Sequence, residues 1–208
     1  MNLSAFETFF PEKRPFFTEG AAIFNAVSGY FYSRRIGGTP SGEAEGDAVQ
    51  YPRSSEILAA AKISGRSASG LTMGGLFALT AQEEASIYDA ASQTVSEVTV
   101  GPRTGYGVVR LRQELGRNGS GIGLFLAGVT RDFQKTDPLA ALYNKNAFTA
   151  YVDFEHRFAN RTYEVSGNLG YTRVTGEPAD IERLQRSSAR YFQRPDATHV
   201  SLDPTRTR

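Results

Sequence analysis

The chain has 208 residues, enough for one large domain or two small ones. Lys and Arg number 23 against 22 Asp and Glu, so the formal net charge of +1 gives no electrostatic argument for a nucleic-acid partner. The sequence has no cysteine, which excludes a disulfide framework and thiolate metal sites. No apolar run approaches about 18 residues, which excludes a transmembrane helix. A mean hydropathy of -0.35 still permits a membrane β-barrel, because only every second residue of a barrel strand faces lipid.

Residues 1–20 are rich in Phe and Pro and differ from the rest of the chain. Pro11 and Pro15 argue against a helix or a central strand between them, and residues 4–7 fit a short capping-box turn. We interpret this segment as a linker or junction whose aromatic side chains pack on a neighbouring domain. It lacks the basic start and apolar core of a secretory signal. We therefore expect a fragment of a longer exported protein, with residues 21–208 as a partial barrel domain.

The remainder of the chain is predicted to be mostly strand, with seven or eight strands in all. Strands are expected at 30–36, 55–64, 71–81, 106–115, 121–133 and within 147–174, with another starting in 190–200. Ile57, Ala59, Ala61 and Ile63 are expected on one face. Asn118 and Gly119 are a strong hairpin signal between the fourth and fifth strands. Residues 82–103 are predicted to be a long polar loop, and residues 176–188 a loop with one or two helical turns.

The hairpin at 147–174 has the clearest pattern. On its first arm Phe148, Val152 and Phe154 point to one face, while Tyr151 and Asp153 point to the other. Each arm runs for about a dozen residues, against a usual strand of about 5–6. With a turn at Asn160-Arg161, the predicted cross-strand pairs are Phe154 with Gly167, Val152 with Leu169, and Arg157 with Glu164.

The connections between the predicted strands alternate in length. Short ones at 65–70, 116–120 and 159–161 separate long ones at 37–53, 82–103, 134–146 and 175–189. Such alternation, on long amphipathic strands, is typical of an outer-membrane β-barrel. Phe148 and Phe158 lie roughly 24 Å apart along the membrane normal for a strand tilted near 45°, close to the barrel's apolar band of about 25 Å. The predicted fold is therefore an all-β, antiparallel up-and-down barrel, and an incomplete one because too few strands are present to close it.

The strings NLSAFETFFPEKRPFFTEGAAIF, FYSRRIGGTP, ILAAAKISG and SSARYFQRPDATHVSLDPTRT carry a resemblance. The chain resembles a bacterial family of unknown function that has an outer-membrane-barrel-like domain. In that family the domain follows an exported module resembling family-nine carbohydrate-binding modules, and more strands follow the DPTRT stretch. The resemblance implies a place in the bacterial outer membrane, contact with its lipid, and a carbohydrate partner held by a module that this chain lacks.

The polar wall of the 147–174 hairpin holds the candidate functional residues. They are Tyr151, Asp153, Glu155, Arg157, Glu164 and Asn168. Asp153 and Glu155 are roughly 6.5–7 Å apart on one strand, within the roughly 5–9.5 Å that glycoside hydrolysis uses. Carboxylates beside Arg157, Arg110 and Arg112 are more simply explained as the hydrogen-bonded lining of a lumen.

Other chemistry has little support in the sequence. His156 and His199 are the two histidines, and their spacing matches no metal motif. The glycine pairs lie within or beside strands, so they form no phosphate-binding loop, and we expect no cofactor. Arg183, Arg186, Arg190 and Arg194 are interpreted as a solvated loop or a surface facing lipopolysaccharide.

Three functions remain open on the sequence alone. The first is part of an outer-membrane barrel with a structural or transport role, tied to carbohydrate binding or uptake. The second is an envelope hydrolase acting on glycans through Asp153 and Glu155. The third is a soluble β-barrel or sandwich used for binding. The pattern favours the first and argues against an enzyme.

Overall fold

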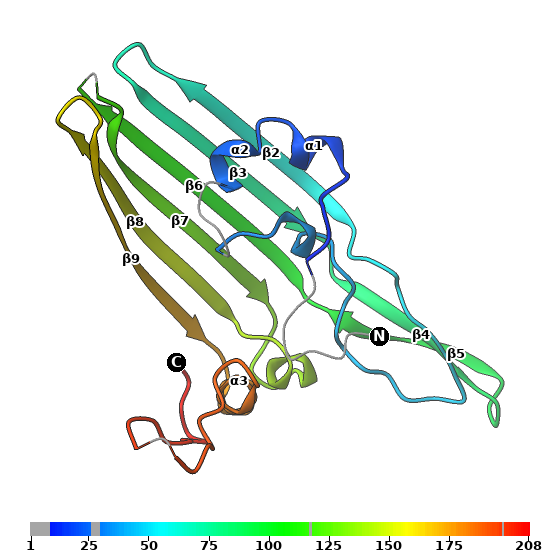
Figure 1. Ribbon diagram of the computed structural model, residues 1–208. Coiled ribbons are helices and arrows are strands. Elements are labelled where there is room, and N and C mark those ends of the chain that lie inside the picture. The colour runs from blue at the N-terminus through cyan, green and yellow to red at the C-terminus, as the bar shows by residue number, and fades with distance from the viewer. Residues whose placement is uncertain (1–8, 26–29, 117, 197) are drawn as a thin grey trace.

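A computed structural model describes residues 9–25, 30–116, 118–196 and 198–208 of the chain. The described part is all-β in character, with two antiparallel sheets and a few short helices (Figure 1). The capping-box turn predicted at residues 4–7 lies outside the described residues.

The larger sheet has six strands in the order β2-β3-β6-β7-β8-β9, each antiparallel to its neighbours. The strands are β2 (Ile57–Arg66), β3 (Leu71–Thr80), β6 (Arg103–Leu115), β7 (Ser120–Asp132), β8 (Asn146–Phe158) and β9 (Tyr163–Thr175). Four of them have 13 residues, more than twice the usual length of about 5–6. The predicted strands at 55–64, 71–81, 106–115, 121–133 and 147–174 are confirmed to within a few residues.

A smaller sheet stands beyond one end of the larger one. It consists of β1 (Ala48–Gln50), β4 (Glu83–Asp89) and β5 (Thr94–Gly101), in the order β1-β4-β5. The prediction of a long polar loop at 82–103 was therefore wrong, because most of that stretch is the β4–β5 hairpin. Its polar composition is explained by exposure, since only a few side chains such as Ala85 and Val100 are fully buried.

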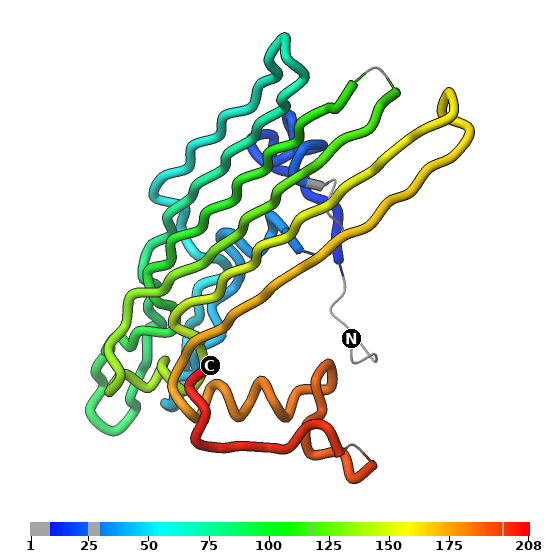
Figure 2. Tube along the Cα trace, turned by 90° about the vertical axis from the view of Figure 1, so that its left-hand side faces the viewer, coloured from blue at the N-terminus to red at the C-terminus, as the bar shows by residue number. Residues whose placement is uncertain are grey.

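The connections follow the predicted alternation. The tight ones between β2 and β3, β6 and β7, and β8 and β9 gather at one end of the sheet, and the long ones lie at the other (Figures 1 and 2). The β8–β9 turn has positive φ at Ala159, Asn160 and Arg161 (48°, 53° and 67°), and Thr162 N–H donates to the Ala159 carbonyl at 3.1 Å. The predicted register is confirmed, since Phe154 pairs with Gly167, Val152 with Leu169 and Arg157 with Glu164.

The two faces of the larger sheet differ. We call the face that contacts residues 9–36 the inner face, and the opposite one the outer face. Strand alternation places exposed apolar side chains from all six strands on the outer face: Ile63, Met73, Phe77, Leu79, Leu111, Leu115, Ile122, Phe148, Val152, Phe154, Phe158, Tyr163, Val165, Leu169 and Tyr171. One residue departs from the sequence expectation. A bulge between Ile57 and Ala59 moves Ile57 off the face shared by Ala59, Ala61 and Ile63, and its side chain packs against the core.

The core lies between the inner face and the N-terminal segment. The segment forms α1 (Pro15–Thr18), α2 (Ala22–Asn25) and the 3₁₀-helix η1 (Ser33–Arg35). The strand predicted at 30–36 is therefore wrong. Three residues of the segment share one buried cluster with four from the sheet: Phe17, Phe24 and Ile36 with Leu76, Ala78, Val108 and Phe125.

Residues after β9 fold beside its end. The 3₁₀-helix η2 (Pro138–Ala141) lies in the β7–β8 connection, and α3 (Pro178–Arg186) confirms the predicted helical turns. The segment 190–200 contains no strand among its described residues, so that prediction was wrong. Within the described ranges, none of the helices is long and apolar enough to cross a membrane.

Candidate functional site

The inner face carries the polar side chains that the sequence singled out. Residue pairing places Tyr151, Asp153, Glu155 and Arg157 of β8 on this face, with Glu164 and Asn168 of β9. All six predicted residues therefore lie on one wall. Asn168 pairs with Asp153 and is exposed.

An arginine of β6 binds a carboxylate of β8 across the strand between them. Arg110 Nη1 lies 2.5 Å from Asp153 Oδ2, and Nη2 lies 3.0 Å from Oδ1. Gly123 of β7 leaves the space for this contact, since a Cβ added there would be 2.5 Å from Asp153 Oδ2 and 2.6 Å from Arg110 Nη2. Only 2% of the Arg110 side chain is exposed. A two-pronged ion pair of this kind is among the stronger polar contacts in proteins.

The ion pairs continue along the wall toward the tight turns. Arg112 Nη2 lies 3.2 Å from Glu155 Oε2, and Arg157 also pairs with Glu155. Arg157 Nε in turn donates to Glu164 Oε2 at 2.9 Å. The wall is therefore a chain of alternating positive and negative groups over β6, β8 and β9.

This arrangement fits a structural lining better than hydrolysis. A glycosidase needs one carboxyl group to donate a proton and another to stay ionised, each facing the substrate. Both Asp153 and Glu155 instead face guanidinium groups of the same wall. Tyr151 is also engaged, since its ring centroid lies 4.9 Å from that of Tyr30 in the N-terminal segment.

The N-terminal segment is held against this face from one edge strand to the other. Lys62 of β2 donates to the carbonyl groups of Phe16 and Glu19. At the opposite edge Gly170 of β9 makes room for Tyr30, because a Cβ on Gly170 would lie 2.5 Å from the Tyr30 hydroxyl oxygen. The segment therefore spans the inner face from β2 to β9.

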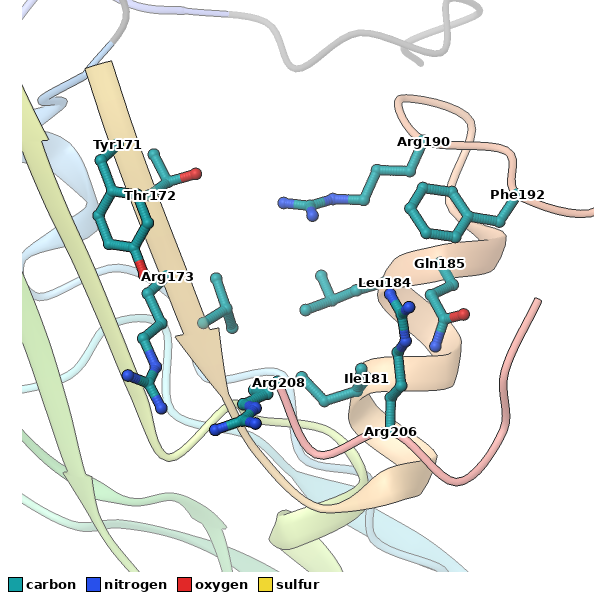
Figure 3. A pocket seen from close by; sticks show the side chains of 11 residues that line it. Tyr171, Thr172, Arg173, Ile181, Leu184, Gln185, Arg190, Phe192, Arg206 and Arg208 are labelled. Atoms are coloured by element: carbon teal, nitrogen blue, oxygen red, sulfur yellow. The ribbon is translucent and has the colours of Figure 1, made fainter. Parts of the chain in front are cut away.

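Two hollows lie near the end of the sheet that has the long connections. One, of about 720 Å³, opens between residues 30–41 and the inner face of β6–β8. The other, of about 450 Å³, lies between the end of β9 and α3. Figure 3 shows Arg173 and Arg208 beside β9 in this second hollow, with Arg190 reaching toward the same space.

Three of the four arginines predicted to form a basic surface near α3 are paired with neighbouring carboxylates. Arg183 binds Asp180 at 2.9 Å, Arg186 binds Glu182 at 2.8 Å and Arg194 binds Asp196 at 2.9 Å. These three are ordinary local ion pairs. Arg190 alone of the four lines a hollow.

Asp180 is the most buried acidic group in the part of the chain that the structure describes. It has no exposed surface, and its Oδ2 has no hydrogen-bond partner there. Burial raises the pKa of the Asp180 carboxyl, while the hydrogen bond from Arg183 opposes the rise. This carboxyl belongs to the first turn of α3 and lies outside the ion-paired wall.

The described residues form no site that could bind a metal ion. They contain no group of three or more His, Asp or Glu side chains placed to hold an ion. His156 projects from the outer face beside Phe158, with ring centroids 5.7 Å apart, and its Nδ1 lies 3.4 Å from Ser120 Oγ.

Comparison with known protein families gives a match. Residues 1–193 match the family described as "Domain of unknown function (DUF5916)". The chain belongs to this family. No curated protein and no solved structure matches the DUF5916 chain. Membership confirms the resemblance to a family of unknown function, and a barrel and an attached carbohydrate-binding module remain proposals.

The sequence did not single out the cleft of about 720 Å³ in this DUF5916 domain. Its lining comes from residues 30–41, Ser55, and residues 101–108, 127–131 and 143–149, which are far apart in the chain. Arg131 carried one visible signal, since it is a charged residue near the end of an otherwise small and apolar strand. The other residues that line the cleft come from four separate parts of the chain, so the spacing of residues in the sequence did not indicate a site.

Proposed function

We propose that this chain forms part of the wall of an outer-membrane β-barrel, with its outer face against lipid and its inner face lining the interior. One observation carries the proposal. A continuous apolar face with large exposed side chains lies on one side of six long strands, and a chain of ion pairs lies on the other. Barrel strands in lipid alternate apolar-out and polar-in in this way.

The exposure of the outer face is large for a face in water. Leu169 is 78% exposed, Ile63 69% and Phe77 52%. Contiguous apolar patches of this extent on water-soluble proteins mark a surface that something covers. Among the described residues, nothing covers this face, because the N-terminal segment packs on the opposite side.

The dimensions and the rim chemistry favour lipid as the cover. Phe148 and Phe158 lie roughly 24 Å apart along the normal of a tilted strand, against a lipid-facing band of about 25 Å. At the end with the tight turns, His156, Phe158 and Tyr163 form a stack, with ring centroids 5.7 and 5.5 Å apart. Aromatic residues of this kind border the apolar band of barrels at the interface.

A closed wall needs more strands than the described six. Within the described ranges, β2 and β9 each have one edge without a partner strand. Unpaired backbone groups are not tolerated in lipid, so further strands complete the barrel in this account. A place in the bacterial outer membrane follows from the proposal. The carbohydrate-binding module, and a carbohydrate partner with it, rest on the resemblance alone.

Folding into lipid vesicles tests the proposal. The protein, in a longer form that supplies the strands needed to close the wall, is added to vesicles and to plain buffer, and folding is read by circular dichroism and by protection of β6–β9 from protease. We expect folding and protection only with lipid. Leu169→Arg should block insertion, since Arg at the midplane costs roughly 2–4 kcal/mol, while its neighbour Asn168→Arg should insert. A protease-resistant monomer in plain buffer, or equal insertion of both variants, would overturn the proposal.

A further inference from the structure

The charged side chains that line the cleft of about 720 Å³ are all positive. Three arginines line it, Arg34, Arg35 and Arg131, and among its described lining residues none is Asp or Glu. The chain as a whole is nearly neutral, at +1. The volume of the cleft falls within the roughly 300–1,000 Å³ that is usual for small-molecule sites. A concave surface with cations and no carboxylate attracts anions.

Arg131 is the central cation of this cleft. Its Nη1 donates to the carbonyl oxygen and to Oδ1 of Asn144, at 2.8 and 2.5 Å. Its Nε and Nη2 have no acceptor among the described residues, although the side chain is only partly exposed. These two nitrogens form the edge of a guanidinium that binds a carboxylate with two parallel hydrogen bonds.

The nearby carboxylate of Asp180 forms no ion pair with Arg131. Asp180 lies close enough to interact electrostatically with Arg131, but Asp180 Oδ1 is bound to Arg183 at 2.9 Å. No ion pair joins Arg131 and Asp180 within 4.0 Å. A guanidinium that is half-buried and bound to neutral acceptors alone keeps its capacity for an anionic partner.

The cleft also has an aromatic wall. Tyr30, Tyr32, Tyr106 and Tyr143 line it, and the guanidinium carbon of Arg131 lies 5.5 Å from the centre of the Tyr143 ring. Tyr143 is fixed in place, because Ser41 N–H donates to its hydroxyl oxygen at 2.5 Å. Rings of this kind give an organic ligand an apolar surface while their hydroxyl groups stay polar.

We propose that the cleft between residues 30–41 and strands β6–β8 binds a small organic anion. The anionic group, a carboxylate or a group of like geometry, takes the free edge of Arg131, and the ring of the ligand lies against the tyrosines. The site is on the inner face, so it does not depend on what covers the outer face.

Titration with benzoate tests this proposal. Isothermal titration calorimetry on the folded protein compares benzoate with benzyl alcohol, which has the ring without the charge, and with inorganic sulfate, which has charge without the ring. We expect saturable binding of benzoate, weaker binding of sulfate and none of benzyl alcohol. Equal binding of benzoate and benzyl alcohol, or no saturable benzoate binding, overturns the proposal.

Variants assign the site to Arg131. Arg131→Gln should weaken benzoate binding by about tenfold or more, the size expected for a lost charge-assisted pair. Arg131→Lys keeps a cation beside Asn144 and should fold even if the glutamine variant does not; its binding should lie between those of wild type and Arg131→Gln. Arg190→Gln, in the hollow of Figure 3, is the matched control and should bind as wild type does. Loss of binding in Arg190→Gln with wild-type binding in both Arg131 variants would place the anion in the other hollow and refute the assignment.

Discussion

Arg110 of β6 binds both carboxylate oxygens of Asp153 of β8 across the intervening strand, at 2.5 and 3.0 Å. The two residues belong to strands that do not pair with each other. They meet because Gly123 of β7, which lies between them, has no side chain. The contact joins β6 to β8 across β7 on the inner face, next to the core residue Phe125, which pairs with Arg110.

The first prediction concerns Gly123. A methyl group in Gly123→Ala would lie 2.5 Å from Asp153 Oδ2 and 2.6 Å from Arg110 Nη2, so these two side chains must move, and we expect the ion pair to break. Breaking a buried pair is strongly destabilising, so we expect the free energy of unfolding to fall by about 3 kcal/mol. Urea titration of wild type and Gly123→Ala measures this difference in the free energy of unfolding. Gly128→Ala on the same strand, where the nearest atom to an added Cβ is 3.8 Å away, is the control and should be close to neutral. Equal effects of the two substitutions would contradict this account.

The second prediction separates a structural Asp153 from a catalytic one. Asp153→Asn leaves the Arg110 charge without its counter-ion, with 2% of that side chain exposed. We expect a loss of about 3–5 kcal/mol in the free energy of unfolding. The double variant Arg110→Met/Asp153→Leu removes both charges and should recover most of that loss. A fully stable Asp153→Asn protein would contradict a structural role for this ion pair.

The third prediction concerns the β8–β9 turn. Ala159 has a φ of 48°, in the left-handed region that glycine adopts without steric cost. Ala159→Gly should therefore stabilise the protein by about 0.5 kcal/mol. Ala150→Gly, the same substitution within extended β8, should destabilise it. Thermal unfolding compares the midpoint temperatures of the two variants with that of wild type. Shifts of the same sign in both variants would rule out strain at Ala159.

The fourth prediction is a pH dependence of the N-terminal segment. The Arg14 side chain donates to Glu12, and this, with a hydrogen bond from Ser33, outweighs burial and lowers the pKa of Glu12 from 4.5 to about 2. A lowered pKa stabilises the folded state above pH 4.5, and the stabilisation is lost as the pH falls toward 2. Arg14 also donates to the Ile36 carbonyl at 2.7 Å, so the pair joins the two ends of the segment.

Wild type and Glu12→Gln provide the measurement. The difference between their free energies of unfolding should be present above pH 4.5 and should shrink as the pH falls toward about 2. A difference that does not change with pH would show that the carboxylate charge at Glu12 is not what holds the segment.

Strand alternation and cross-strand charge were enough to predict part of this molecule. The register of the 147–174 hairpin followed from Arg157 facing Glu164 and Val152 facing Leu169, since a slip by one residue would reverse the faces. The alternation of short and long connections was also visible in the sequence. These features depend on residues that are near one another in the chain.

Other features depend on distant contacts and were missed. Residues 30–36 have the composition of a strand, but Arg14 binds the Ser33 and Ile36 carbonyls and η1 forms instead. The hairpin β4–β5 is polar because it projects from the larger sheet. The bulge beside Ile57 lets that side chain reach the core under the N-terminal segment. The cleft around Arg131 is assembled from five separate parts of the chain, so no local sequence pattern indicates it.

The most direct test of the central claim is the lipid exposure of alternate residues on β9. The sequence has no cysteine, so single cysteines at positions 165, 166, 168 and 169 can each carry a nitroxide label without a background. In lipid vesicles, collision rates with oxygen and with a water-soluble nickel complex report lipid and water. We expect labels at Val165 and Leu169 to collide mainly with oxygen, and labels at Ser166 and Asn168 mainly with nickel. Equal nickel access at all four positions would show that the outer face is not against lipid.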